Sequence, residues 1–189
     1  MQPEERQIRA VYDDQTITVY QAYHQAIAAS AVQHQTFVSP PFKMDRMTWI
    51  KPSFLWMMYR CGWATKPNQE HVLAIRITRA GFDWALAHAC LSHFDPHIHA
   101  SEAAWKEELQ HAPVRIQWDP ERDIHLNKLD YRAIQIGLSG IAVQQYVQEW
   151  IVEVTDITAF CRKVYETSLH EPAAAQALIP VEVPYTPLP

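Results

Sequence analysis

The sequence predicts a single α+β domain with a mixed, largely antiparallel sheet and flanking helices. Segments rich in β-branched and aromatic residues alternate with helical patterns, but irregularly, without the regular strand–helix–strand units of parallel sheets. The length of 189 residues, 48% of them hydrophobic, suits one sizeable core. We expect this domain over residues 1–168, followed by a proline-rich tail over 169–189 that wraps the domain in extended form.

Strand patterns, in which β-branched and aromatic residues dominate or apolar residues alternate with polar ones, recur along the whole chain. They cover Ile8–Tyr12, Thr16–Tyr23, Met47–Ile50, His71–Arg79, Pro113–Trp118, Arg132–Leu138 and Glu149–Val154. The first two are separated only by the polar residues Asp13, Asp14 and Gln15, and this spacing predicts a hairpin.

Helical patterns fill most of the intervening sequence. They cover His24–Gln35, Ser53–Gly62, Phe82–Cys90, Ser101–Gln110, Gly140–Gln148 and Asp156–Glu166. The second is the best defined, because Pro52 suits the start of a helix and Gly62 suits its C-cap. In this helix Phe54, Met57 and Met58 recur at helical spacing, so we expect them in the core.

Composition excludes several classes of protein. Only four glycines are present and no glycine-rich phosphate-binding loop, which excludes P-loop and Rossmann nucleotide sites. The net charge of −5 argues against a general polyanion binder. No apolar run is long enough to span a bilayer, and the charged start MQPEERQIRA lacks a signal core, so we expect a cytoplasmic protein. The thiols Cys61, Cys90 and Cys161 form no CxxC pair and are expected to be reduced.

Three histidines, His93, His97 and His99, gather with Asp95 in a segment that also contains a proline. Imidazole and carboxylate are metal ligands, but no cluster of cysteines or glutamates supports them in the neighbouring sequence. The pattern therefore favours a solvated loop, and we expect no metal.

Individual residues could serve a ligand or the fold. Trp49, at the end of a short strand, could stack on a ligand or pack in the core. Glu149, at the start of an apolar strand, could be a solvated strand-edge residue or a catalytic carboxylate, with Glu153 on the same face as its alternative. Arg9 could pair with a carboxylate or hold a phosphate, because the guanidinium suits both.

Two segments carry a resemblance to a known fold. TWIKPSFLWMMYR, followed by HVLAIRI, resembles the second motif of the ADP-ribosyltransferases, and QEWIVEVTDIT resembles their last motif, in which a catalytic glutamate begins a strand. Over nearly its full length, including IRAVYDDQTITVYQAY and QWDPER, the chain is similar to an uncharacterised domain-of-unknown-function family, the one numbered 4291. That family brings no established activity.

The ADP-ribosyltransferase resemblance implies an enzyme that consumes NAD and transfers or hydrolyses ADP-ribose. Glu149 matches the catalytic glutamate, and Trp49, or a neighbour such as Thr48 or Ser53, matches the aromatic or serine of the second motif. The first motif has two candidates, which are Arg9 and the pair Tyr20 and Gln21. The acceptor, whether protein, nucleic acid or small molecule, is not specified by the sequence.

The alternative is a non-catalytic module that retains the fold and binds a nucleotide, an RNA end or a protein through the aromatic surface between Trp49 and Trp63. The positions of three side chains distinguish the two hypotheses. Convergence of Arg9, Trp49 and Glu149 in one cleft would favour the enzyme, whereas a Glu149 that points into solvent would favour the module.

Overall fold

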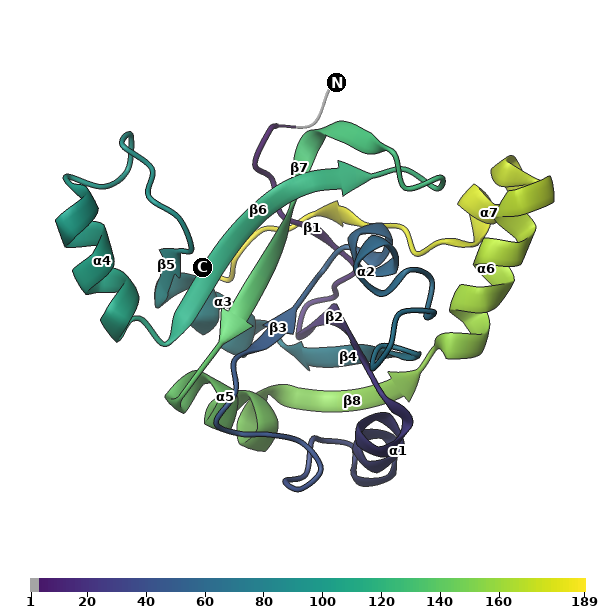
Figure 1. The fold of residues 1–189 in the computed structure, drawn as a ribbon, viewed down its shortest axis with the longest axis horizontal. Helices are drawn as coiled ribbons and strands as arrows, with labels where there is room; N and C mark the ends of the chain where they lie inside the picture. The colour runs from purple at the N-terminus through teal and green to yellow at the C-terminus, as the bar shows by residue number, and fades with distance from the viewer. Residues whose placement is uncertain (1–3) are drawn as a thin grey trace.

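The chain folds as two facing sheets with helices at their ends and edges, in a computed structural model that describes residues 4–189 (Figure 1). The three-stranded sheet has the order β2-β4-β8, the four-stranded sheet has the order β3-β7-β6-β5, and a two-stranded ribbon joins β1 to β9. All these pairs are antiparallel except β5 with β6. The expected α+β class with a mixed, mostly antiparallel sheet is confirmed.

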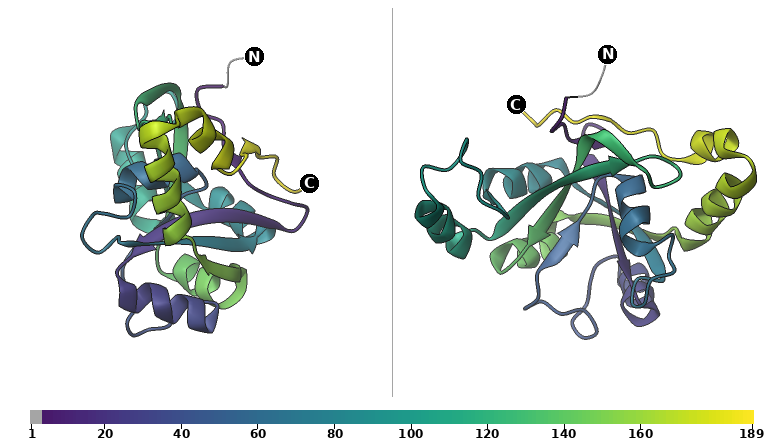
Figure 2. Two further views of the ribbon diagram at one scale, coloured as in Figure 1. Left: turned by 90° about the vertical axis from the view of Figure 1, so that its right-hand side faces the viewer. Right: turned by 45° about the horizontal axis from the view of Figure 1, so that its top comes forward.

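The strands have the following bounds: β1 Arg9–Ala10, β2 Thr16–Tyr23, β3 Thr48–Ile50, β4 His71–Thr78, β5 Ala89–Leu91, β6 Val114–Arg122, β7 Lys128–Leu138, β8 Ile151–Asp156 and β9 Val183–Pro184. The helices are α1 Gln25–His34, α2 Phe54–Cys61, α3 Arg79–Ala87, α4 Glu102–His111, α5 Ile141–Gln145, α6 Thr158–His170 and α7 Pro172–Leu178, and a π-helical turn, η1, covers Tyr146–Trp150. Helix α4 lies at one end of the molecule, and α6 and α7 lie at the other (Figures 1 and 2).

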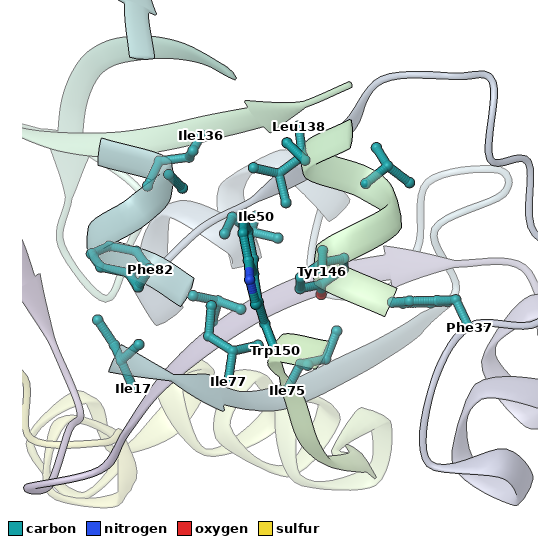
Figure 3. Packing of buried hydrophobic residues seen from close by; sticks show 14 of the residues in the cluster. Ile17, Phe37, Ile50, Ile75, Ile77, Phe82, Ile136, Leu138, Tyr146 and Trp150 are labelled. Atoms are coloured by element: carbon teal, nitrogen blue, oxygen red, sulfur yellow. The ribbon is translucent and has the colours of Figure 1, made fainter. Parts of the chain in front are cut away.

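The main core lies between the two sheets. Ile75 and Ile77 of β4 face Ile136 and Leu138 of β7, and the Trp150 ring inserts between them (Figure 3). All four aliphatic side chains are fully buried, because alternate residues of each strand point to the same face of the sheet. The opposite face of the four-stranded sheet is therefore left for polar side chains.

A second apolar cluster forms where α2 packs against α6 and α7. Phe54, Met57 and Met58 are almost completely buried there, as their helical spacing predicted. The predicted C-cap of α2 is confirmed, because Gly62 adopts the left-handed conformation that ends the helix. At the other end the N-cap is Ser53, whose hydroxyl accepts a hydrogen bond from the Trp56 N–H, so Pro52 precedes the helix and does not lie in its first turn.

Three local expectations need correction. The expected hairpin of Ile8–Tyr12 with Thr16–Tyr23 forms only next to its turn, where Tyr12 bridges Ile17 and the Thr18 N–H donates to the Val11 carbonyl, whereas β1 pairs with β9. Cys90 lies in strand β5 rather than in the helix before it. The tail is helical over α7, where Ala175 is buried against α6, and is extended only beyond that helix.

The segment around Glu149 also differs from the expected strand. Strand β8 begins at Ile151, and Glu149 belongs to η1. This π-helical turn contains one residue more than an α-helical turn and is closed by a hydrogen bond from the Ile151 N–H to the Tyr146 carbonyl. This turn directs Trp150 into the core, where its ring lies so close to Gly81 that a Cβ there would be 2.3 Å from it. Glu149, one residue earlier, is exposed.

Among residues 4–189, no helix combines the length and the hydrophobicity that crossing a bilayer requires.

Candidate functional site

The strongest candidate site is a hollow on the polar face of the four-stranded sheet, beside α2. Two adjoining cavities of about 520 and 570 Å³ lie there, and both are lined by Trp49, Lys51 and Arg60. We call these two cavities together the central cleft. Each falls within the size range of small-molecule sites.

The floor of the first cavity is built by alternate residues of β6 and β7. Gln117 is paired with Gln135 across the two strands, and Asp119 follows on the same face. The Asp119 carboxylate accepts hydrogen bonds from both amides, at 3.1 Å from Gln117 Nε2 and 2.8 Å from Gln135 Nε2. The two amides therefore hold this carboxylate in a fixed position.

Trp49 lines both cavities. It is paired with Gly137 of β7, and an added Cβ on Gly137 would lie 3.0 Å from two atoms of the indole ring. Because glycine has no side chain, the ring can lie against the backbone of the neighbouring strand. Trp49 is only half-buried, so part of its surface faces the cleft.

Lys51 is an unusually buried cation, with 7% of its surface exposed. Its backbone bridges β2 by two hydrogen bonds with Tyr20, which fixes the side chain between the two sheets. Its Nζ donates to the Trp49 carbonyl at 3.2 Å, which is its one hydrogen bond within residues 4–189. Burial, reinforced by the nearby Arg60, lowers the pKa of Lys51 to about 7. Two of its N–H bonds remain available to a ligand.

Arg122 and two aromatic rings form the far wall. The guanidinium lies 3.7 Å from the centre of the Tyr59 ring and 5.6 Å from that of Trp56. Two donors of this wall, Arg122 Nε and Trp56 Nε1, are buried and have no hydrogen-bond partner among the described residues. Buried donors without a partner cost free energy, so this wall is suited to a ligand that supplies acceptors.

The charge of the cleft is opposite to that of the whole chain. Its lining includes the cations Lys43, Arg46, Lys51, Arg60, Arg122 and Lys128. Asp119 is the single carboxylate among the lining residues, although the chain as a whole carries a net charge of −5. Within residues 4–189 none of these six cations forms a salt bridge. Such an arrangement attracts anions.

Of the residues singled out in the sequence as ligand contacts, Trp49, Thr48 and Gln21 line the cleft. Gln21 is otherwise engaged in the core, where its Nε2 donates to Thr48 Oγ1 at 2.6 Å and its Oε1 accepts from the Tyr146 hydroxyl at 2.7 Å. Tyr20 is buried against Phe54, with ring centres 5.7 Å apart.

Arg9 and Ser53 line a third cavity of about 350 Å³, together with Glu121 and Glu182, which shares Arg122 with the central cleft. Arg9 donates to the Glu182 carbonyl at 2.9 Å and so ties β1 to the C-terminal segment. Glu149 is exposed and lines neither this cavity nor the central cleft. The structure therefore does not bring Arg9, Trp49 and Glu149 together.

Lys51, Asp119, Arg122 and Gln135 were not singled out in the sequence. Arg122 lies over the Tyr59 ring and donates to the Leu126 carbonyl. One sequence signal was available: Lys51 interrupts an otherwise uncharged run from Met47 to Tyr59, and a lysine in such a run is expected to be buried or bound.

A comparison with protein families places this geometry in context. Residues 7–185 match the model of a family described as a domain of unknown function, DUF4291. The chain belongs to the DUF4291 family. The match includes both sheets, α2 and every residue of the central cleft, so the cleft is part of the DUF4291 domain. Among curated proteins, none matches the chain significantly.

Proposed function

We propose that this DUF4291 domain binds a phosphorylated nucleotide in the central cleft, with NAD as the first candidate. The observation that carries the proposal is the concentration of six cations around one carboxylate in a chain of net negative charge. Phosphate oxygens would satisfy the Lys51 ammonium and the unpaired Arg122 Nε, both of which are buried donors.

The aromatic residues of the cleft suit the other part of such a ligand. Trp49 is half-buried and presents part of a flat ring to both cavities, and a base stacks favourably on a ring of this kind. Trp56 is buried and stacks with Tyr59, with ring centres 5.1 Å apart, and the Arg122 guanidinium lies over the Tyr59 ring. NAD consists of two nucleosides, each with a flat base, that are connected by a pyrophosphate. The cleft likewise consists of two cavities, and Lys51 and Arg60 line both of them.

Calorimetric titration of the purified protein with NAD, ADP-ribose and AMP tests this proposal. We expect saturable binding, and we expect Arg122→Gln and Arg60→Gln to weaken it by about tenfold or more. Lys106→Gln is the matched control, because Lys106 is exposed and pairs with Glu102 on helix α4. Absence of saturable binding, or equal affinity in the cleft variants and the control, would overturn the proposal.

A second candidate function is ADP-ribose transfer, which the resemblance to ADP-ribosyltransferases implies. In that reaction the bond between nicotinamide and the ribose C1′ breaks, nicotinamide leaves with the electron pair, and an acceptor or water oxygen bonds to C1′ and loses its proton. A carboxylate near C1′ stabilises the positive charge that develops. The resemblance assigns this role to Glu149, whereas Asp119 is the carboxylate that lines the cleft.

Release of nicotinamide from NAD distinguishes these assignments. A loss of activity in Glu149→Gln alone would support the resemblance, whereas a loss in Asp119→Asn alone would assign the role to Asp119. Binding of NAD without release of nicotinamide by the wild-type protein would identify a binding module. In that case a short 5′-phosphorylated RNA, added as a competitor, shows whether the same cleft takes an RNA end.

A further inference from the structure

The end of the molecule that carries α4 is held to the rest by few apolar contacts. No residue from Ser92 to His111 is buried. The described polar contacts with the rest of the chain include hydrogen bonds of 2.8 Å from Trp105 Nε1 to the Leu91 carbonyl and from the Ser92 N–H to the Ile116 carbonyl, and an ion pair of 3.4 Å between Arg6 and Asp95. Within the segment, the Trp105 ring lies near Phe94 and His99. We call Ser92–His111 the α4 excursion. A segment with so little buried apolar surface needs another source of stability.

Three side chains from separate parts of the chain meet at the base of this excursion. Cys90 comes from β5, His99 from the loop and Glu108 from α4. One ligand atom from each, namely the Cys90 sulfur, a His99 ring nitrogen and a Glu108 carboxylate oxygen, lies within 4.8 Å of the other two. Cys90 is buried, His99 is half-buried and Glu108 is exposed, so the group extends from the core to the surface.

The histidine is oriented by the backbone of its own loop. His99 Nδ1 lies 3.1 Å from both the backbone nitrogen and the carbonyl oxygen of Asp95. In one tautomer Nδ1 accepts a hydrogen bond from the Asp95 N–H, and in the other it carries a proton and donates to the carbonyl. The second tautomer leaves the free lone pair on Nε2, and a backbone carbonyl that holds the other nitrogen is the usual support of a metal-ligating histidine.

We propose that Cys90, His99 and Glu108 bind a zinc ion that fastens the α4 excursion to strand β5. Thiolate, imidazole and carboxylate are the three ligand types that zinc takes in proteins, and the soft sulfur disfavours magnesium and calcium. Thiolate and carboxylate together balance the charge of the ion.

A cavity beside the three side chains leaves room for a fourth ligand. His99 and Glu108 line this cavity of about 370 Å³, whose wall includes Trp105. Water or a small anionic ligand in this cavity would complete a tetrahedral site. Of the three histidines of the loop, His99 contributes a ligand atom to this group, whereas His93 and His97 do not.

This zinc site is independent of the proposed nucleotide site. The residues around it line a different cavity from those of the central cleft, and none is shared. Loss of zinc and loss of nucleotide binding can therefore be measured separately.

Metal analysis of the purified full-length chain tests the proposal. After dialysis against a chelator and reconstitution with zinc, we expect about one tightly bound zinc per chain. Reconstitution with cobalt should produce the absorption of a thiolate-to-cobalt charge transfer, because the site contains a cysteine. Cys90→Ser should abolish this absorption, and His99→Gln and Glu108→Gln should weaken zinc binding by about tenfold or more.

Neighbouring residues supply matched controls. Glu107→Gln changes the adjacent carboxylate of α4, and His97→Gln changes an exposed histidine of the same loop. Both should bind zinc as the wild type does. Because Glu108 is exposed on a helix, Glu108→Gln should fold even if Cys90→Ser does not. A wild-type chain that retains no zinc, or an equal loss in the controls and the three ligand variants, would overturn the proposal.

Hydrogen exchange gives a second measure. Zinc should slow amide exchange in Ser92–His111 of the wild type and leave that of Glu108→Gln unchanged, because the ion joins the excursion to β5. Equal exchange with and without zinc in the wild type would show that the ion does not fasten this segment.

Discussion

The Trp49 ring lies against the backbone of Gly137 on the neighbouring strand, in a space that a Cβ would fill. Such a Cβ would come within 3.0 Å of two indole atoms and 2.7 Å of Met47 Sδ. The position of the ring that lines both cavities of the central cleft therefore depends on the absence of a single methyl group. Gly137 faces Trp49, whereas its neighbours Ile136 and Leu138 face the core. A change at Gly137 should therefore alter the shape of the cleft without altering the core beneath it.

Gly137→Ala should displace Trp49 and weaken nucleotide binding. Trp49 is half-buried at the edge of the cleft, so it can move without unfolding the chain, and we expect an affinity loss of about tenfold. Calorimetric titration and tryptophan fluorescence measure the two effects. Gly140→Ala is the control, because nothing lies within 4 Å of its added Cβ, although its positive φ costs some stability. Equal affinities in the wild type and Gly137→Ala would contradict the role given to the ring.

Burial of Lys51 should make stability rise with pH. Its pKa is about 7 in the folded chain, against an ordinary value of 10.5, so between these values the unfolded state binds more protons. The free energy of unfolding of the wild type should therefore increase from about pH 7 to about pH 10, by a few kcal/mol relative to Lys51→Met. Urea unfolding at several pH values measures it. If the free energies of unfolding of the wild type and Lys51→Met differ by the same amount at every pH, burial does not neutralise Lys51.

The same lysine predicts the pH dependence of ligand binding. A phosphate stabilises the charged ammonium, so binding above pH 7 must be accompanied by uptake of a proton. Affinity for the nucleotide should therefore fall as the pH rises from about 7 to 9, and the fall should be smaller in Lys51→Met. Titrations in buffers of different ionisation enthalpy would detect the proton directly. Affinity that is independent of pH in the wild type would exclude a contact between Lys51 and the phosphate.

Burial of Glu182 should make the free energy of unfolding fall as the pH rises, the opposite of the effect of Lys51 on stability. Burial raises its pKa from 4.5 to about 8, although its carboxylate accepts a hydrogen bond of 2.7 Å from the Phe54 N–H. Between these values the folded state binds more protons, so stability should fall as the pH rises from about 5 to 8. Glu182→Gln keeps an acceptor for Phe54 and should remove this fall. If the wild type and the variant lose stability in parallel over this range, Glu182 is not its source.

Gly81→Ala should destabilise the fold, because its Cβ would lie 2.3 Å from the Trp150 ring in the main core. Overpacking of this kind costs about 1–3 kcal/mol. Ala80→Ser, at an exposed position of the same helix, should change the stability by less than about 0.5 kcal/mol. Thermal unfolding of the two variants compares them. An unaltered melting temperature in Gly81→Ala would mean that Trp150 can be accommodated elsewhere.

The parts of the fold that depend on local chemistry could be predicted from the sequence. The end of α2 follows from Gly62, and the strands β2 and β4 follow from their composition and alternation. The burial of Phe54 and Met57 follows from helical spacing. In each case the neighbours that decide the structure lie within a few residues along the chain.

The candidate site depends on neighbours that are far apart in the sequence. Asp119 meets Gln135 only through the register of β6 and β7, and Lys51 becomes buried only because its backbone bridges Tyr20. Glu149 was placed at the start of a strand because QEWIVEV reads as one extended segment. The Trp150 side chain instead has to reach Gly81, and a π-helical turn directs it there.

The ribbon of β1 and β9 has a consequence for the order in which the chain folds. Arg9 pairs with Pro184, and Arg79 donates at 2.6 Å to the Thr186 carbonyl, so both contacts need a segment that the ribosome makes late. Closing so long a loop is slow and carries a large entropic cost. The two facing sheets can form earlier, because β2, β4 and β8 precede this segment. The first strand of the fold is therefore among the last to find its partner.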